Sequence, residues 1–291
     1  SAVRGEFSAI STSLPGVQFS EVLPQTARLA HRLAVVRSMS HENPNHVQAC
    51  LPAQTGHVHP REFRSRGDFP PSATDFPPVG AVVDAVRPAR GDLPTWVRIG
   101  PLMRRSNGTT LHGQLPGLLG RRHTSFVVDQ PLTPADVKIE AVQPNDDLTS
   151  IRLDGRRGLL EQLDRQRKLI DEVAAAQNLA SDYRRAFNLL SSQRTRRAFD
   201  LASESRVTRD SYGKTEFGQR CLLARRLAEA GVPMINISYC HTPRGSWDTH
   251  GSNFIKMRKS LGPTLDESLS ALLTDLHQRA MLDDVLVVVN A

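Results

Sequence analysis

The stretch KTEFGQRCLLARRLAEAGVPMINISY, residues 214–239, decides the fold class. Its first part, Lys214 to Ala230, predicts a helix, and Gly231 stands where a helix commonly ends. The run from Val232 to Tyr239 is apolar enough for a buried strand. A helix that leads directly into a buried strand is typical of proteins in which helices pack on a mostly parallel sheet.

The regions on either side continue this alternation of helices and strands. Toward the C-terminus, the pattern predicts a helix from Pro263 to Ala280 and a strand from Val285 to Val289. Toward the N-terminus it predicts, in chain order, a helix from about Ser20, a strand over Leu33–Val36, a helix over Asn45–Gln54, a helix over Val79–Val86 and a strand over Thr95–Ile99. The expected fold class is α/β, with a mostly parallel central sheet and helices on both faces.

The 291 residues are expected to form a single domain. Turn residues and short apolar patches predict an irregular excursion over about 60–150, and helical spacing predicts a helical insert over about 157–205. The sequence starts at Ser1 without a signal peptide and stops at Ala291, inside the last predicted strand. We therefore expect an internal fragment, truncated at both ends.

Composition excludes some classes of protein. Hydrophobic residues make up 39% of the chain, which is too many for a disordered protein, and no apolar run approaches the roughly 18 residues of a membrane span. The chain has 37 basic and 30 acidic residues, a net charge of +7. Because arginine doublets are spread along the chain without interleaved aromatic residues, we expect no nucleic-acid binding. The three cysteines lack the spacing of a structural zinc site.

The loop after the Val232–Tyr239 strand carries the sharpest chemical signal, GSWDTHG over residues 245–251. Asp248 and His250 stand two residues apart at the carboxyl end of a predicted parallel strand, so both can face one pocket. A carboxylate and an imidazole suit Zn²⁺, Mn²⁺ or a related divalent ion. The alternative is that Asp248 caps the following turn and His250 binds the backbone.

A second cluster contains His41, His46, His57 and His59, close to the carboxyl end of the Leu33–Val36 strand. Neutral imidazole is both a metal ligand and a general base. His46 opens a predicted helix, whose N-terminus favours anions such as sulfate or phosphate. His57 and His59 follow a turn and are expected to be structural or exposed. The chain has no GxSxG, HExxH, P-loop or GxGxxG motif, which argues against α/β-hydrolase, zincin and nucleotide-binding functions.

Four ordered segments resemble an uncharacterised bacterial family of sulfatase-like proteins, a domain of unknown function in the alkaline phosphatase superfamily. They are Leu33–His41 followed by His46 and Thr55-Gly56, Tyr212–Leu227, Trp247–Gly251, and Leu282–Val289. The resemblance implies an α/β sandwich, divalent metal ions (zinc, manganese or calcium) at the carboxyl ends of the strands, and export to the periplasm or beyond. It assigns Asp248 and His250 to one metal ion and places further ligands outside residues 1–291.

The nucleophile departs from the sulfatase pattern. In that pattern a Cys or Ser stands nine residues before the Thr of a Thr-Gly pair, and here this position is His46. Cys50 starts a Cys-x-Pro sequence but lacks the Arg of the motif, and we expect it to be a buried helix residue.

The leading hypothesis is an exported, metal-dependent hydrolase-like protein that acts on a sulfate or phosphate ester. Asp248 and His250 would bind the metal, His46 would be catalytic, and His41 would bind substrate. The alternative is a non-catalytic module that binds an anionic polysaccharide or an envelope partner, to which the basic charge also fits. The oligomeric state cannot be read from the sequence.

Overall fold

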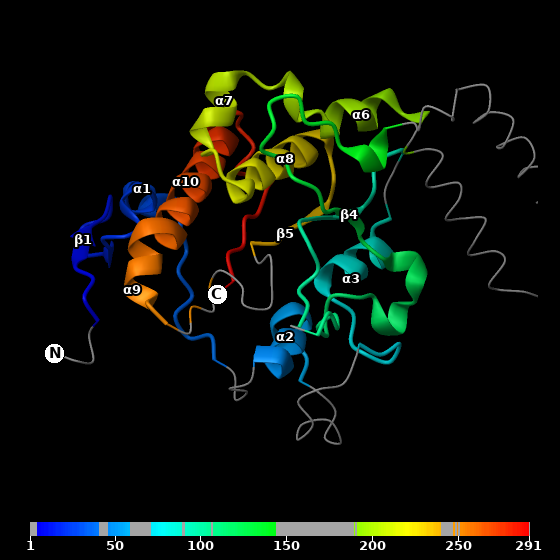
Figure 1. The fold of residues 1–291 in the computed structure, drawn as a ribbon, viewed down its shortest axis with the longest axis horizontal. Helices are drawn as coiled ribbons and strands as arrows, with labels where there is room; N and C mark the ends of the chain where they lie inside the picture. Colours follow the sequence, from blue (N-terminus) through cyan, green and yellow to red (C-terminus); the bar gives the residue numbers. More distant parts are fainter. Residues whose placement is uncertain are drawn as a thin grey trace, which may run out of the picture.

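The structure, a computed structural model, describes residues 5–40, 46–58, 71–88, 91–105, 107–143, 189, 191–239, 247, 249 and 251–290; the side chains of residues 46 and 47 are not included. Figure 1 shows helices packed around a small sheet.

The central sheet has three parallel strands in the order β4-β3-β5. These strands are β4 (Phe126–Val128), β3 (Trp96–Ile99) and β5 (Met234–Ile237). In the register of β3 and β5, Trp96 lies opposite Met234 and Arg98 lies opposite Asn236. The carboxyl ends of all three strands therefore lie at one edge, and the fold class is mixed α/β, as predicted.

Helices cover both faces of this sheet (Figure 1). On one face, Val97 and Ile99 pack into the main core with α8 (Glu216–Ala230) and α10 (Gly262–Gln278). On the other face, α3 (Val79–Val86) contacts β3 and β5. Gly80 permits this contact, because a Cβ atom at that position would lie 2.2 Å from the Trp96 indole. Every residue of β3 is consequently buried.

Helix α8 is set by clear start and stop signals. The Thr215 hydroxyl accepts a hydrogen bond from the Gly218 amide at 3.1 Å, and Gly231 ends the helix with a φ of 96°. Both ends agree with the prediction from sequence to within two residues.

The N-terminal residues form a small unit on α10. Strands β1 (Ala9–Ser11) and β2 (Gln18–Ser20) make an antiparallel hairpin, followed by α1 (Pro24–Arg28). Asp266 of α10 is 2% exposed, and its carboxylate accepts hydrogen bonds from the Gln25 and Thr26 amides at 2.8 and 2.7 Å. A helix residue thus caps α1 from a distant part of the sequence.

The remaining elements are short. They are α2 (His46–Thr55), α6 (Gln193–Phe199), α7 (Arg206–Ser211), α9 (Asn253–Lys256), a π-helical segment Met257–Leu261, and 3₁₀ turns at Ala30–Arg32, Gly117–Leu119, Arg121–His123, Glu140–Val142 and Leu201–Ser203. Within the described residues, no helix is both long and apolar enough to cross a membrane. Most of the predicted helical insert lies outside the described residues.

Two predicted strands are wrong. Residues 33–36 and 285–289 pair with no strand among the described residues, and both contain exposed apolar side chains. Val36 is 66% exposed and Leu286 is 88% exposed, although Val285 and Val287 pack against the main core. A strand needs a hydrogen-bonding neighbour as well as apolar side chains, and neither run has one here. The helix predicted from about Ser20 is also wrong in extent, because α1 is only five residues long.

Candidate functional site

Trp247, which follows β5 in the sequence, packs near the carboxyl edge of the sheet through aromatic contacts. The ring of Trp247 lies 5.1 Å from that of Tyr239, and Tyr239 contacts Phe217 of α8 at 4.4 Å. The Thr249 carbonyl accepts a hydrogen bond from Lys256 Nζ of α9 at 2.7 Å, which joins it to the following helix. Trp247 is thus the residue of this segment that contacts the strand end where the sequence predicts a site.

Of the predicted site residues, only the backbone of His46 lies within the part of the chain that the structure describes. His41, Asp248 and His250 lie outside the described residues, and His46 is the first residue of α2, with its side chain outside the description. The structure therefore neither brings these side chains together nor separates them.

Arg220 of α8 lies at the same edge. It is 4% exposed, and its Nη1 donates to the Ser238 carbonyl at 2.7 Å. Gly100, at the end of β3, has a φ of 100°, and a Cβ atom there would lie 2.8 Å from Arg220 Nη1. Burial lowers the pKa of Arg220, and the nearby Glu216 carboxylate opposes that shift. The guanidinium thus joins α8 to the ends of β3 and β5.

Arg98 is the second buried arginine near this edge, one residue before the end of β3. Only 3% of it is exposed, and its Nε and Nη2 atoms have no hydrogen-bond partner. The guanidinium carbon lies 5.9 Å from the centre of the Trp96 ring. Burial lowers the pKa of Arg98 to about 10, so the side chain stays charged at neutral pH.

Cys50 of α2 is close enough to Arg98 for the two groups to interact electrostatically. The thiol belongs to a residue that is 6% exposed, and burial raises its pKa to about 12 in spite of the arginine. It is therefore protonated at neutral pH and a poor nucleophile. The prediction that Cys50 is a buried helix residue is confirmed.

Comparison with known proteins places the whole chain in one family. The family described as "Protein of unknown function (DUF1501)" matches residues 1–291. The chain belongs to this family. No curated protein and no solved structure matches it.

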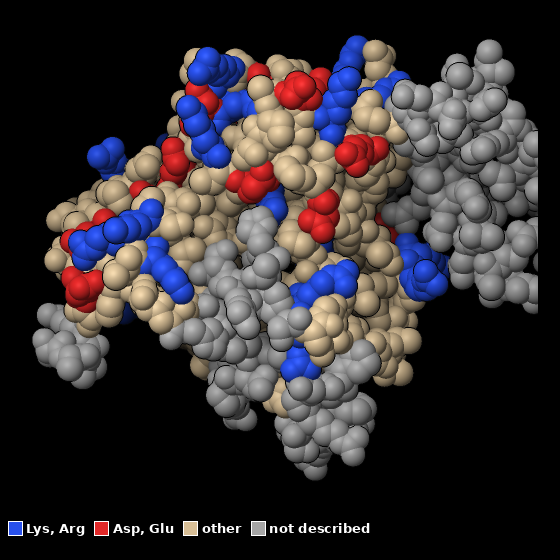
Figure 2. Space-filling model, in the orientation of Figure 1, with Lys and Arg blue, Asp and Glu red and all other residues tan. Residues whose placement is uncertain are grey.

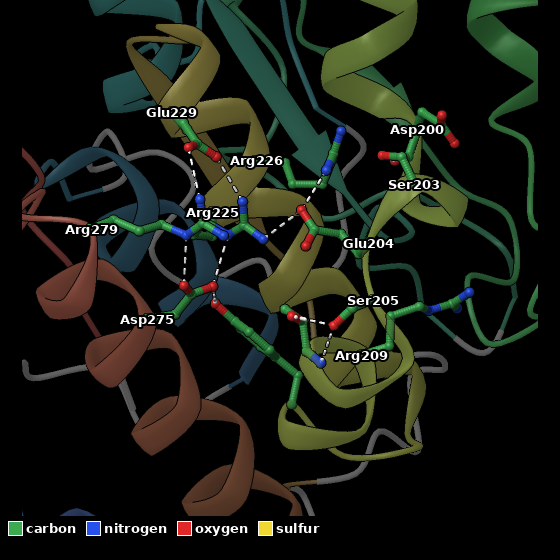
Figure 3. Close-up of polar contacts among 12 residues, drawn as sticks. Asp200, Ser203, Glu204, Ser205, Arg209, Arg225, Arg226, Glu229, Asp275 and Arg279 are labelled. Carbon is green, nitrogen blue, oxygen red and sulfur yellow. Dashed lines mark hydrogen bonds and ion pairs between the residues drawn. The ribbon is translucent and has the colours of Figure 1, made fainter.

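An ionic network in this DUF1501 chain surrounds the buried Arg225 of α8 (Figure 3). Arg225 is 1% exposed and contacts Glu204 and Glu229 at 2.7 Å and Asp275 of α10 at 2.9 Å. Arg226 also pairs with Glu204, and Arg279 pairs with Asp275 and Glu229. Three arginines thus meet three carboxylates. The network joins α8, α10 and the segment around Glu204, and we interpret it as structural.

Two buried histidine–aspartate pairs were missed in the sequence. His112 Nδ1 lies 2.8 Å from Asp75, and His123 Nδ1 lies 2.8 Å from Asp84 of α3. His123 Nε2 also accepts from Arg122 Nε at 2.8 Å, so both of its ring nitrogens are used. The partners are about 40 residues apart in the sequence, and no local motif marks them. These pairs attach the irregular segment to α3.

A cavity of about 260 Å³ lies at the opposite, amino edge of the sheet. It is lined mainly by proline and arginine side chains from the segments that precede β3 and β5: Arg87, Pro88, Leu93, Pro94, Arg194, Gly231 and Pro233. Ligands of open parallel sheets bind at the carboxyl edge, so we do not assign this cavity to the site.

In the described part of the chain, no group of three or more His, Cys, Asp and Glu side chains is arranged to hold a metal ion. On the face seen in Figure 2, basic and acidic side chains are interspersed over the described surface and form no continuous basic stripe. The cations that distinguish the carboxyl edge are therefore the two buried ones, Arg98 and Arg220.

Proposed function

We propose that this DUF1501 protein is an exported, metal-dependent hydrolase-like protein that acts on a sulfate or phosphate ester. The observation that carries the proposal is the contact of Trp247 with Tyr239 at the carboxyl edge of a parallel sheet, next to the position of Asp248 in the sequence. This edge is where open α/β sheets bind ligands. Two buried arginines nearby favour an anionic group. An alkaline phosphatase-like, sulfatase-like domain is the architecture that this proposal implies.

Asp248 and His250 would hold the divalent ion. Their donor set, one carboxylate oxygen and one imidazole nitrogen, fits zinc or manganese better than calcium, which prefers oxygen ligands. Their neighbour Trp247 contacts Tyr239 at the strand end. When bound, such an ion polarises the ester and lowers the pKa of a water molecule. Further ligands are needed to complete the coordination.

The chain's own residues would bind and orient the substrate. His46, at the start of α2, would act as a general base, and His41 would contact the anionic group. In the hydrolysis, water adds to sulfur or phosphorus and the ester bond breaks. The water oxygen and one proton stay with the sulfate or phosphate, and the other proton leaves with the alcohol.

A second function is favoured by the state of Cys50. Because Cys50 is only 6% exposed and burial raises the pKa of its thiol to about 12, it offers no exposed nucleophile to a substrate. The protein would then bind an anionic polysaccharide or an envelope partner through the same edge, without turnover.

The test is hydrolysis of 4-nitrophenyl sulfate and 4-nitrophenyl phosphate with added Zn²⁺, Mn²⁺ or Ca²⁺. Asp248→Asn and His250→Gln are compared with Asp283→Asn and His277→Gln, which change exposed residues of the same types. We expect metal-dependent turnover that is lost only in the first two variants. Retention on a heparin column without turnover would support the binding function. If the protein shows no turnover and is not retained on the heparin column, both proposals are contradicted.

A further inference from the structure

Arg98 is a buried cation for which the described residues supply no ion-pair partner. Its side chain makes no hydrogen bond or ion pair with any described residue, although only 3% of the residue is exposed. Buried charges in folded proteins are normally paired, because an uncompensated charge in a low-dielectric interior is unfavourable. An exception of this kind calls for a physical reason.

The described neighbours of Arg98 give its Nε and Nη2 atoms no strong acceptor. Asn236 lies opposite it in the register of β3 and β5, but Asn236 Oδ1 accepts a 2.6 Å hydrogen bond from Trp96 Nε1. The Trp96 ring makes only a cation–π contact, with its centre 5.9 Å from the guanidinium carbon of Arg98. Cys50 carries a protonated thiol, which is a weak acceptor. No described carboxylate forms an ion pair with Arg98, in contrast to Arg225.

The two unpartnered atoms of Arg98 form a specific recognition edge. In a guanidinium group, the Nε and Nη2 hydrogens point in nearly parallel directions along the same side. Two parallel donors of this kind match two oxygens of a carboxylate, sulfate or phosphate group, and such bidentate contacts are among the strongest hydrogen bonds in proteins. The unpaired donors are therefore a complete side-on pair and not two scattered atoms.

We propose that the Nε and Nη2 edge of Arg98 binds the oxyanion of a sulfate or phosphate group at the carboxyl end of β3. This inference deepens the proposed function and rests on it for the identity of the anion, since it names the residue that takes the charged end of the ester. A free inorganic anion and the end group of an ester present the same oxygens, and binding measurements with both distinguish these sources.

Retention of an unpaired charge implies a difference between the free and the bound protein. Without an anion, replacement of Arg98 by the apolar side chain of methionine removes an uncompensated charge and leaves no partner behind. The free Arg98→Met protein should therefore be as stable as the wild type or more stable. With an anion, the wild type gains stability by mass action and the variant does not.

The experiment measures thermal unfolding and calorimetric binding with sodium sulfate, sodium phosphate and 4-nitrophenyl sulfate, at an ionic strength matched with sodium chloride. The proteins are the wild type, Arg98→Met, Arg98→Lys and the control Arg206→Met, which changes a side chain that is 90% exposed. Because sulfate also stabilises proteins non-specifically, only the saturable response counts.

We expect saturable binding by the wild type and by Arg206→Met. Arg98→Lys keeps the charge but loses the side-on donor pair, so it should bind at least about tenfold more weakly. Arg98→Met should show no saturable response. Equal binding by the wild type and Arg98→Met, or no saturable binding by any protein, would overturn the inference. Failure of Arg98→Met to fold would also overturn it, because that result means that Arg98 has an essential partner within the chain.

Hydrolysis assays on the same proteins separate this inference from the proposed function. If Asp248→Asn loses turnover while Arg98→Met binds sulfate like the wild type, the proposed function stands and the role of Arg98 is wrong. If Arg98 variants lose sulfate binding but no protein hydrolyses an ester, the anion site stands and the proposed activity is wrong.

Discussion

Arg225 and Arg98 lie on opposite sides of the central sheet, and they are buried to almost the same extent, with 1% and 3% of each residue exposed. Arg225, on α8, meets three carboxylates and joins α8 to α10 (Figure 3). Arg98, on the face of β3 that packs against α3, meets no carboxylate of the described residues. Burial of a charge therefore has two meanings here. The first arginine is part of the framework, and the second indicates a ligand.

The pKa values of the two guanidinium groups shift in opposite directions. Burial alone would lower both pKa values. For Arg225, the hydrogen bond with Glu204 and the charges of Asp275 and Glu204 outweigh burial, and its pKa is raised. For Arg98, burial prevails and its pKa is lowered to about 10. The folded state thus favours the charge at one position and disfavours it at the other.

The largest effect is expected from Arg225→Met. This change removes the buried cation between the half-buried carboxylates of Glu204 and Asp275, which keep only Arg226 and Arg279 as partners, so we expect a loss of about 1.5–3 kcal/mol in the free energy of unfolding. Urea denaturation measures it, with Arg206→Met as the exposed control, which should differ from the wild type by less than about 0.5 kcal/mol. A loss no larger than that of the control would show that the network is not structural.

Acid should weaken the ionic network around Arg225. For Glu204 and Asp275, burial would raise the pKa, but hydrogen bonds from arginines, and for Asp275 also from Tyr212, outweigh it and lower the pKa in the folded state. The stability that they contribute is complete above their ordinary pKa values of 4.5 and 3.8, and is lost as pH falls through the lower folded values. Urea denaturation from about pH 6 to about pH 3 measures this loss.

The matching variant is Glu204→Gln, which cannot lose a charge in acid. Its free energy of unfolding should be lower at neutral pH and should fall less steeply toward acid than that of the wild type. Parallel pH profiles for the two proteins would mean that Glu204 does not contribute through its charge.

A smaller effect is expected for the two described thiols. Burial raises the pKa of both Cys50 and Cys221 to about 12. Iodoacetamide should therefore label neither residue in the folded protein near pH ~8 and should label both in urea, as peptide mass spectrometry can show. Above the ordinary pKa of 9.0, the folded state holds these protons more tightly than the unfolded state, so stability should fall as pH rises. Rapid labelling of folded Cys50 would contradict its buried, protonated state.

Much of the framework could be predicted because it depends on local signals. Helix α8 has a Thr cap at one end and a Gly at the other, and the strand after it is apolar throughout. The runs over residues 33–36 and 285–289 have the same apolar character, yet neither is a strand in the structure. An apolar run reports a preference for burial but does not report whether a neighbouring strand is present.

The candidate site was less predictable. The alternation of side-chain types in Trp96-Val97-Arg98-Ile99 identifies a strand, and it is typical of strands with one solvent-exposed face. In the structure both faces of β3 are covered, and Arg98 is buried. Its covering elements come from distant parts of the chain, and so do the carboxylates around Arg225. Pairing and burial of charge are thus tertiary properties. The predicted ligands Asp248 and His250, together with His41 and the His46 side chain, remain predictions.

The most direct test of the difference between the two arginines is the free energy of urea unfolding of Arg98→Met and Arg225→Met, each compared with the wild type in chloride buffer free of sulfate and phosphate. We expect Arg98→Met to be at least as stable as the wild type and Arg225→Met to be clearly destabilised. A destabilisation of Arg98→Met as large as that of Arg225→Met would contradict this expectation, because Arg98 would then be a structural cation with a partner in the chain.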